Sequence, residues 1–109
     1  MPESNISSVK SRVQPIFQSI LDCHYEGDFK AISEIYPSSP SHAFEQAVSI
    51  LKPLGKSTMV EFLGTINKVS ETKLLWKVSY QDSREELLWE LSIEANSNEP
   101  KLVGIGFDK

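Results

Sequence analysis

The side chains that could do chemistry are few, and the densest group lies around residue 23. Asp22, Cys23, His24 and Asp28 follow one another closely. A histidine with nearby carboxylates could hold a metal ion or act as a base, but this spacing matches no known ligand motif. Cys23 has no basic cluster to lower its pKa, so it is better interpreted as a half-buried small apolar residue than as a nucleophile. We predict solvated polar side chains at a helix end, with no metal site, no catalytic residue and no cofactor.

Two tryptophans, Trp76 and Trp89, are the other candidates for a site. Their flat rings could stack on an apolar ligand, with Tyr80 and Phe62 beside them, which makes these four the candidate ligand-binding residues. The alternative, which the pattern favours, is an aromatic pair in the core beneath a layer of helices.

Both tryptophans lie in stretches where apolar and polar residues alternate, which predicts two β-strands joined as a hairpin. A turn centred on Asp82 and Ser83 would pair Trp76 with Trp89. The apolar members of the two arms are Leu74, Trp76, Val78 and Tyr80, and Leu87, Trp89, Leu91 and Ile93.

The first half of the chain predicts helices instead. Apolar spacings of three and four indicate a helix over about residues 7–25, kinked at Pro15. Asp28 suits the N-cap of a short second helix over 29–36. A third amphipathic helix covers about 44–51. Residues 1–5 are expected to be frayed.

After the third helix the apolar period changes to two and predicts four strands, the hairpin being the middle pair. Short connections between successive strands favour an antiparallel meander. Register and loop lengths then place one apolar set on the face toward the helices: Phe62, Gly64, Ile66, Trp76, Val78, Tyr80, Leu87, Trp89, Leu91, Ile93, Val103, Ile105 and Phe107. We therefore expect an α+β domain over residues 1–109, with three N-terminal helices packed on a curved four-stranded antiparallel sheet.

Two stretches resemble a known family. Tyr25-Glu-Gly-Asp-Phe-Lys-Ala-Ile-Ser-Glu-Ile-Tyr36 is similar to the junction between the first two helices of small bacterial members of the nuclear transport factor 2-like superfamily, and Lys101-Leu-Val-Gly-Ile-Gly-Phe107 resembles their last strand. The resemblance implies the cystatin-like cone fold. It does not select a function, because this superfamily contains isomerases, dehydratases and transport adaptors.

The enzymes of that superfamily, such as the ketosteroid isomerase-like and scytalone dehydratase-like members, use acid–base groups on the concave face of the sheet. An enzyme that resembles them would need such groups on the same face. Here Tyr80 is the one ionisable residue in the set expected on that face. Acid–base catalysis needs a carboxylate, histidine or tyrosine with a tuned pKa inside the pocket. We therefore predict that the protein is not an enzyme.

The opposite face of the sheet is mixed. Leucines interrupt its charged and hydroxylic residues, and superfamily members commonly dimerise through their sheets. The resemblance thus implies a homodimer interface, for which the candidates are Leu63, Leu75, Lys77, Leu88 and Glu90. The alternative is a solvated face with isolated leucines.

Composition excludes other classes of function. The formal net charge is −4 and the basic residues are scattered, whereas a nucleic-acid-binding protein needs a basic stripe. No apolar run approaches the ~20 residues of a membrane span, and the N-terminus does not resemble a signal peptide. We expect a soluble cytoplasmic protein that acts without enzymatic activity as a protein-association module. The alternative is a small apolar-ligand-binding protein with a pocket between helices and sheet.

Overall fold

The computed structural model describes residues 5–38, 40–95 and 101–108. The helices come first: α1 (Asn5–Glu26), α2 (Phe29–Ile35) and α3 (Ser41–Leu51), which continues into a 3-10 turn, η1 (Lys52–Leu54). The strands follow: β1 (Ser57–Asn67), β2 (Glu71–Tyr80), β3 (Leu87–Glu94) and β4 (Leu102–Asp108). All neighbouring strands are antiparallel, in the order β1-β2-β3-β4. The predicted α+β class and meander are confirmed. Of the segment expected to be frayed, residues 1–4 lie outside the described residues and Asn5 begins α1.

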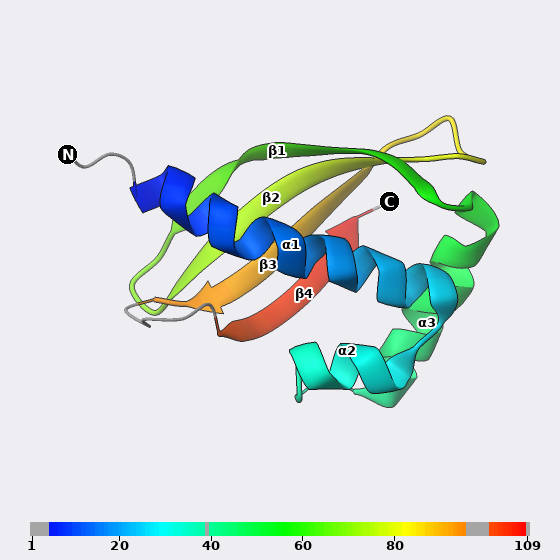
Figure 1. Cartoon of the computed structure of the whole chain (residues 1–109), viewed down its shortest axis with the longest axis horizontal. Helices are drawn as coiled ribbons and strands as arrows, with labels where there is room; N and C mark the ends of the chain where they lie inside the picture. The colour runs from blue at the N-terminus through cyan, green and yellow to red at the C-terminus, as the bar shows by residue number, and fades with distance from the viewer. Residues whose placement is uncertain (1–4, 39, 96–100, 109) are drawn as a thin grey trace.

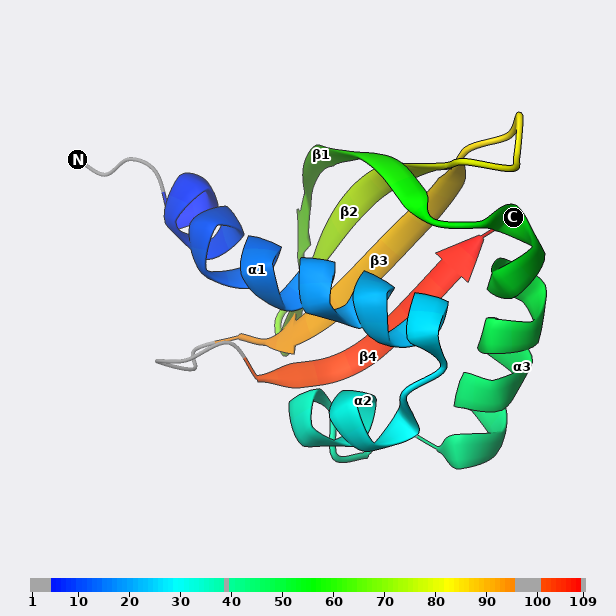
Figure 2. The same cartoon turned by 45° about the vertical axis from the view of Figure 1, so that its right-hand side comes forward.

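The helices cover the concave side of the curved sheet (Figure 1). α1 crosses that side, α2 lies next to β4, and α3 stands where β4 ends (Figure 2). α1 continues through Pro15. The predicted cap is confirmed, because the Asp28 carboxylate accepts a hydrogen bond of 3.1 Å from the Ala31 N–H at the start of α2. In the described part of the chain, no helix combines the length and the apolar character that crossing a membrane requires.

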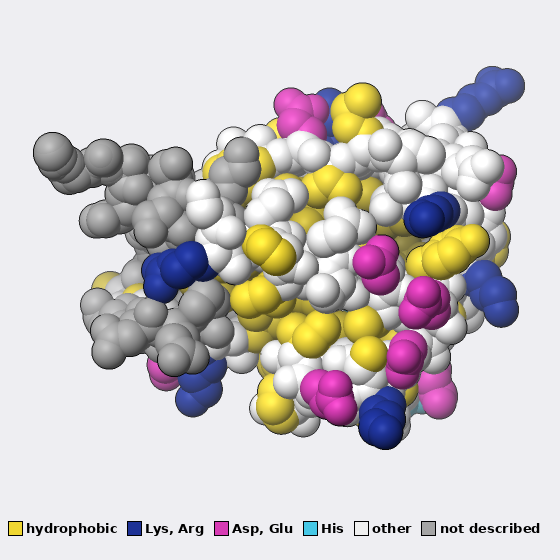
Figure 3. Space-filling model, in the orientation of Figure 1, with side chains coloured by type: hydrophobic (Ala, Val, Ile, Leu, Met, Phe, Trp, Pro, Cys, Tyr) yellow, Lys and Arg dark blue, Asp and Glu magenta, His cyan; other side chains and the backbone are white. Residues whose placement is uncertain are grey.

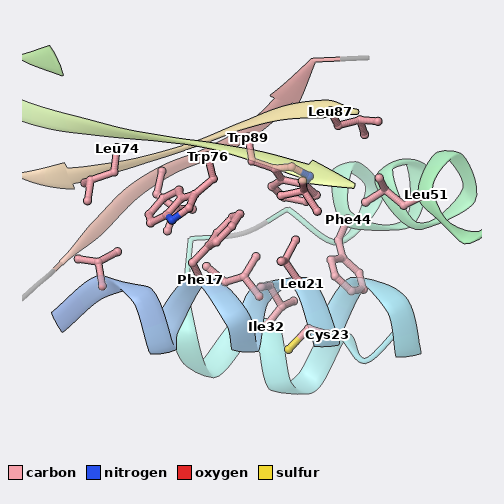
Figure 4. Close-up of a cluster of buried hydrophobic side chains, with 14 of the residues drawn as sticks. Phe17, Leu21, Cys23, Ile32, Phe44, Leu51, Leu74, Trp76, Leu87 and Trp89 are labelled. Atoms are coloured by element: carbon pink, nitrogen blue, oxygen red, sulfur yellow. The ribbon is translucent and has the colours of Figure 1, made fainter. Parts of the chain in front are cut away.

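The core lies between α1 and the middle of the sheet. Val13, Phe17 and Ile20 of α1 are fully buried, and they belong to one cluster with the hairpin tryptophans, which are also fully buried. Figure 4 shows Phe17 beside Trp76 and Trp89. Trp76 pairs with Trp89 across β2 and β3, as the alternation predicts. Each side chain of this kind stabilises the fold by about 1.5–3 kcal/mol through burial of apolar area.

A β-bulge at Leu63 changes the expected faces of β1. Phe62 lies opposite Trp76, but the next pair is Gly64 with Leu75, so that Leu63 has no partner in the ladder. One extra residue reverses which face each later side chain occupies. Ile66 is therefore 46% exposed on the outer face. The prediction that Gly64 and Ile66 face the helices was wrong.

The last strand carries a similar irregularity at Val103. Leu102 lies opposite Ile93, and the following pair is Gly104 with Ser92. Leu102 packs against the core, whereas Val103 is exposed, contrary to its predicted place on the inner face. Beyond the bulge the prediction holds, because Ile105 and Phe107 pack against the core as expected.

Candidate functional site

An open pocket of about 390 Å³ lies between α2, α3 and β4. Figure 2 shows α2 beside β4 and α3 at the end of that strand. Hydrophobic side chains reach the surface between α1 and α2, and acidic side chains lie beside them (Figure 3). The pocket is lined by His24, Ile32, Tyr36, Pro40, Ala43, Phe44, Ala47, Gly104, Ile105, Gly106 and Phe107. Most of these residues have apolar side chains, while main-chain and side-chain polar atoms form a substantial part of the wall. Apolar side chains with convergent polar groups are common in small-molecule sites.

His24 contributes the imidazole of this wall. The residue is only 6% exposed, and its Nδ1 lies 2.8 Å from the carbonyl oxygen of Ile20 one turn earlier. Because a carbonyl oxygen only accepts, Nδ1 carries the proton and Nε2 is left as an acceptor. The ring lies 4.8 Å from that of Phe44 and 5.4 Å from that of Trp89. The expectation of a solvated His24 was wrong.

The surroundings of His24 favour the neutral ring. Burial lowers its pKa below the ordinary value of 6.5, and the hydrogen bond to the Ile20 carbonyl opposes this shift more weakly. His24 is therefore a neutral hydrogen-bond acceptor at physiological pH.

The four residues predicted to bind a ligand lie in or against the core instead. Trp76 and Trp89 do not line the pocket, because Phe17 of α1 fills the space beneath them. Both indoles have internal hydrogen-bond partners: Trp76 Nε1 donates to Gln14 Oε1 over 3.1 Å, and Trp89 Nε1 donates to Tyr80 Oη over 2.9 Å. The assignment of a ligand site to these residues is therefore corrected, and their interpretation as core aromatics holds.

Phe62 and Tyr80 complete this aromatic layer. Phe62 is partly buried and meets Trp76 edge to face, with ring centroids 5.5 Å apart. Tyr80 is buried, and burial raises its pKa to about 12 in spite of the hydrogen bond from Trp89. Tyr80 and His24 line a second space of about 10 Å³, which is no larger than a single water requires.

Cys23 is an inert thiol in this arrangement. It is buried, and its pKa is raised first by burial and then by the nearby carboxylates of Asp28, Glu26 and Asp22. A raised pKa keeps the thiol protonated and unreactive. Among the described residues, no group of three or more His, Cys, Asp or Glu side chains is placed to hold a metal ion.

The sequence did contain a signal for His24. Phe17, Ile20 and Leu21 lie seven, four and three residues before it, which is the spacing of one helix face. The histidine therefore continues the buried stripe of α1. Reasoning limited to the sheet residues missed it, because the pocket takes its imidazole from a helix.

The five predicted interface residues lie on or beside the sheet face away from the helices. Leu63 and Leu88 are 49% and 41% exposed. The other three take part in cross-strand pairs: Leu75 lies opposite Glu90, and Lys77 lies opposite Leu88. Lys77 forms ion pairs with Glu61 at 3.2 Å and Glu86 at 3.7 Å, and Lys73 pairs with Glu90 at 3.3 Å.

Comparison with known proteins assigns no relative to this chain. No protein-family model matches the sequence, and no match was found among curated proteins or solved structures.

Proposed function

We propose that this protein binds a small apolar ligand in the pocket between α2, α3 and β4. The observation that carries the proposal is an open cavity of about 390 Å³ that is lined mainly by residues with apolar side chains and contains a buried, neutral histidine. Pockets of roughly 300–1,000 Å³ with this kind of lining are typical of small-molecule sites. The apolar walls supply affinity, and the polar atoms orient the ligand.

Binding without catalysis accounts better for the chemistry of the lining. Among the described residues that line the pocket there is no carboxylate, and the ionisable side chains are those of His24 and Tyr36. General acid–base catalysis commonly uses two groups with pKa values held apart. The position of the pocket, between helices and sheet, agrees with what the resemblance to the nuclear transport factor 2-like superfamily implies. Membership of that superfamily stays a prediction.

Trp89 offers a direct test of ligand binding. Its ring lies 4.9 Å from that of Phe107 and 5.4 Å from that of His24, and both of these residues line the pocket. A Trp76→Phe variant leaves Trp89 as the sole tryptophan. When this variant is titrated with naphthalene, 2-naphthol and hexanoic acid in turn, at least one of the compounds should cause a saturable change in the fluorescence of Trp89. No response to any apolar compound of a wider panel would contradict the proposal.

Matched substitutions on α3 locate the binding. Ala47 lines the pocket, whereas Ser49 on the same helix is exposed and does not. Ala47→Phe should fill the cavity and weaken binding at least tenfold, and Ser49→Phe should leave it unchanged. Equal affinity in the two variants would place the ligand elsewhere.

Protein association through the outer sheet face is the second candidate function, and the bulge in β1 favours it. The bulge adds Ile66 to a face that already exposes Met59, Leu63 and Leu88. Exposed apolar side chains that gather on one face suggest an interface, and we propose that a second copy of this chain covers it.

Sedimentation velocity at micromolar concentration tests this dimer. Leu88→Glu and Leu63→Glu should shift the protein toward monomer. Val69→Glu is the control, because Val69 is also exposed but lies in the turn between β1 and β2. A protein that is monomeric at every concentration and indifferent to all three changes would exclude the dimer.

A further inference from the structure

The β4 side of the pocket is made by the edge of the strand. Gly104, Ile105, Gly106 and Phe107 all line it, although they are consecutive. Successive side chains of a strand point to opposite faces, so that a wall formed by one face would use every second residue. A wall of consecutive residues indicates that the cavity runs along the main chain. In the described sheet β4 is an edge strand, with β3 on one side only.

The hydrogen bond from Tyr36 shows which way the main-chain groups point. The Tyr36 hydroxyl donates to the carbonyl oxygen of Val103 over 3.3 Å, so this carbonyl faces α2 rather than β3. Because the peptide unit is planar and trans, the N–H of Gly104 points the opposite way, toward its partner Ser92 on β3. Alternation along the extended chain then directs both the N–H and the C=O of Ile105 toward the pocket.

The start of β4 supports this assignment independently. There the Glu94 N–H donates to the carbonyl oxygen of Lys101 over 2.9 Å, so Lys101 faces β3. A regular strand would turn Val103 the same way as Lys101. The bulge at Val103 reverses the alternation, and it thereby turns the polar groups of Ile105 to the open edge.

In the part of the chain that the structure describes, α2 and α3 supply no side-chain partner for these groups. The Tyr36 hydroxyl is engaged with Val103. The other described residues of α2, α3 and their connection that line the pocket have apolar side chains: Ile32, Pro40, Ala43, Phe44 and Ala47. No hydrogen bond from a described residue outside the sheet reaches the Ile105 main chain. Water can pair with these groups while the pocket is open, but a ligand that displaces the water without pairing with them would leave a donor and an acceptor unsatisfied, at a cost of about 1–3 kcal/mol each. A ligand that pairs with this N–H and C=O avoids that cost.

We propose that the ligand is a small apolar molecule with an amide edge, that is, a lactam, an imide or a primary carboxamide. Its N–H pairs with the carbonyl of Ile105, its C=O pairs with the N–H of Ile105, and its apolar body lies against Pro40, Ala43 and Ala47. The inference rests on the proposed function and specifies the ligand class. An extended peptide would form hydrogen bonds with the same N–H and C=O of Ile105. A small molecule fits better, because Tyr36 already occupies the edge at Val103 and limits the strand that could be added.

Matched ligands test the amide edge. Isoquinolin-1(2H)-one is a flat bicyclic lactam, isocoumarin replaces its N–H by oxygen, and 2-methylisoquinolin-1-one blocks the N–H. In titration calorimetry the lactam should bind about tenfold or more tightly than either analogue, because each analogue leaves the Ile105 carbonyl unpaired. Equal affinities for the three compounds would overturn the inference. So would tighter binding of a blocked dipeptide such as N-acetyl-alanyl-alanine amide.

A main-chain substitution locates the contact. Ile105→Pro removes the N–H that faces the pocket. It removes no hydrogen bond between β4 and β3, because this N–H points away from β3, and proline is tolerated at such a position of an edge strand. The substitution should abolish the preference for the lactam, whereas Ile105→Val should retain it. If the proline variant does not fold, the amide resonance of Ile105 in the unsubstituted protein provides the same test: it should shift downfield with the lactam and much less with isocoumarin. No selective shift would overturn the inference.

The two levels of proposal fail separately. Binding of naphthalene or 2-naphthol with no advantage for the lactam would overturn the amide edge and leave the proposed function standing. If none of these compounds binds, both the amide edge and the proposed function are overturned.

Discussion

Phe17 stacks on Trp76, with ring centroids 4.1 Å apart and planes inclined by only 12°. The same phenylalanine meets Trp89 edge to face at 5.8 Å. One side chain of α1 therefore occupies the space beneath both hairpin tryptophans (Figure 4). This contact turns what could have been a binding cleft into core, and the cavity lies instead along β4.

Removal of this ring should destabilise the protein strongly. Phe17→Ala deletes a fully buried aromatic ring and leaves a cavity between two indoles, so the free energy of unfolding should fall by about 3–5 kcal/mol. Urea unfolding followed by circular dichroism measures this loss. Phe17→Leu fills much of the space and should cost less than half as much. A loss below about 1 kcal/mol for the alanine variant would show that the core can collapse onto the gap.

Gly64 should be required for its backbone conformation rather than for space. Its φ is +154°, and a Cβ added there would meet no atom within 4 Å. Gly64→Ala should therefore lower the free energy of unfolding by about 1–3 kcal/mol through backbone strain alone. Chemical denaturation of the variant tests this.

Gly106→Ala is the matched control for that substitution. Gly106 also lies in a strand and its φ is not in the left-handed range, while an added Cβ would make an ordinary contact of 3.7 Å with Glu90. Its stability should match or exceed that of the unsubstituted protein, because glycine weakens a strand. Equal losses at the two positions would argue against a strained bulge at Gly64.

The hydroxyl of Tyr80 should contribute to stability through Trp89. Tyr80→Phe removes the acceptor of the Trp89 indole N–H and leaves a buried donor unpaired, at a cost of about 1–3 kcal/mol. Tyr25→Phe removes a hydroxyl from an exposed ring and should change stability by less than 0.5 kcal/mol or so. Comparison of the two variants by thermal unfolding distinguishes the hydrogen bond from a general effect of hydroxyl removal.

The sequence predicts the middle of the sheet well and its two edge strands less well. Trp76 and Trp89 pair as expected because both arms of the hairpin alternate without a break. In β1 and β4, one unpaired residue reverses the sheet face that each later side chain occupies. Apolar residues lie on both sides of each bulge, so the alternation in the sequence does not show this reversal. Gly64 and Gly104 carried local signals, because a glycine inside a strand often marks a bulge.

The site depended on information that a strand pattern does not contain. The pocket joins His24 of α1, Tyr36 after α2 and the main chain around Ile105. The helical spacing could have identified His24 as buried. The open edge at Ile105 follows from the bulge at Val103 and from the hydrogen bond to Tyr36, and both arise from tertiary packing.

The buried histidine should make stability depend on pH. Burial lowers the pKa of His24 below 6.5 in the folded protein, whereas in the unfolded chain it lies near 6.5. Between these two values the unfolded state binds more protons, so the free energy of unfolding falls as the pH is lowered through about 6.5, by at most about 1.4 kcal/mol per pH unit for one proton. Tyr80, with a pKa of about 12, stays neutral throughout this range.

Denaturation between about pH 5 and pH 7.5 isolates this contribution, because most carboxylates are already ionised there. His24→Gln should flatten the dependence, whereas His42→Gln should leave it intact, since His42 is exposed. A folded-state pKa for His24 at or above 6.5 in an NMR titration would contradict the prediction. It would also mean that the imidazole can be protonated inside the pocket, where a cation would lie against the apolar walls and disfavour the uncharged ligand proposed above.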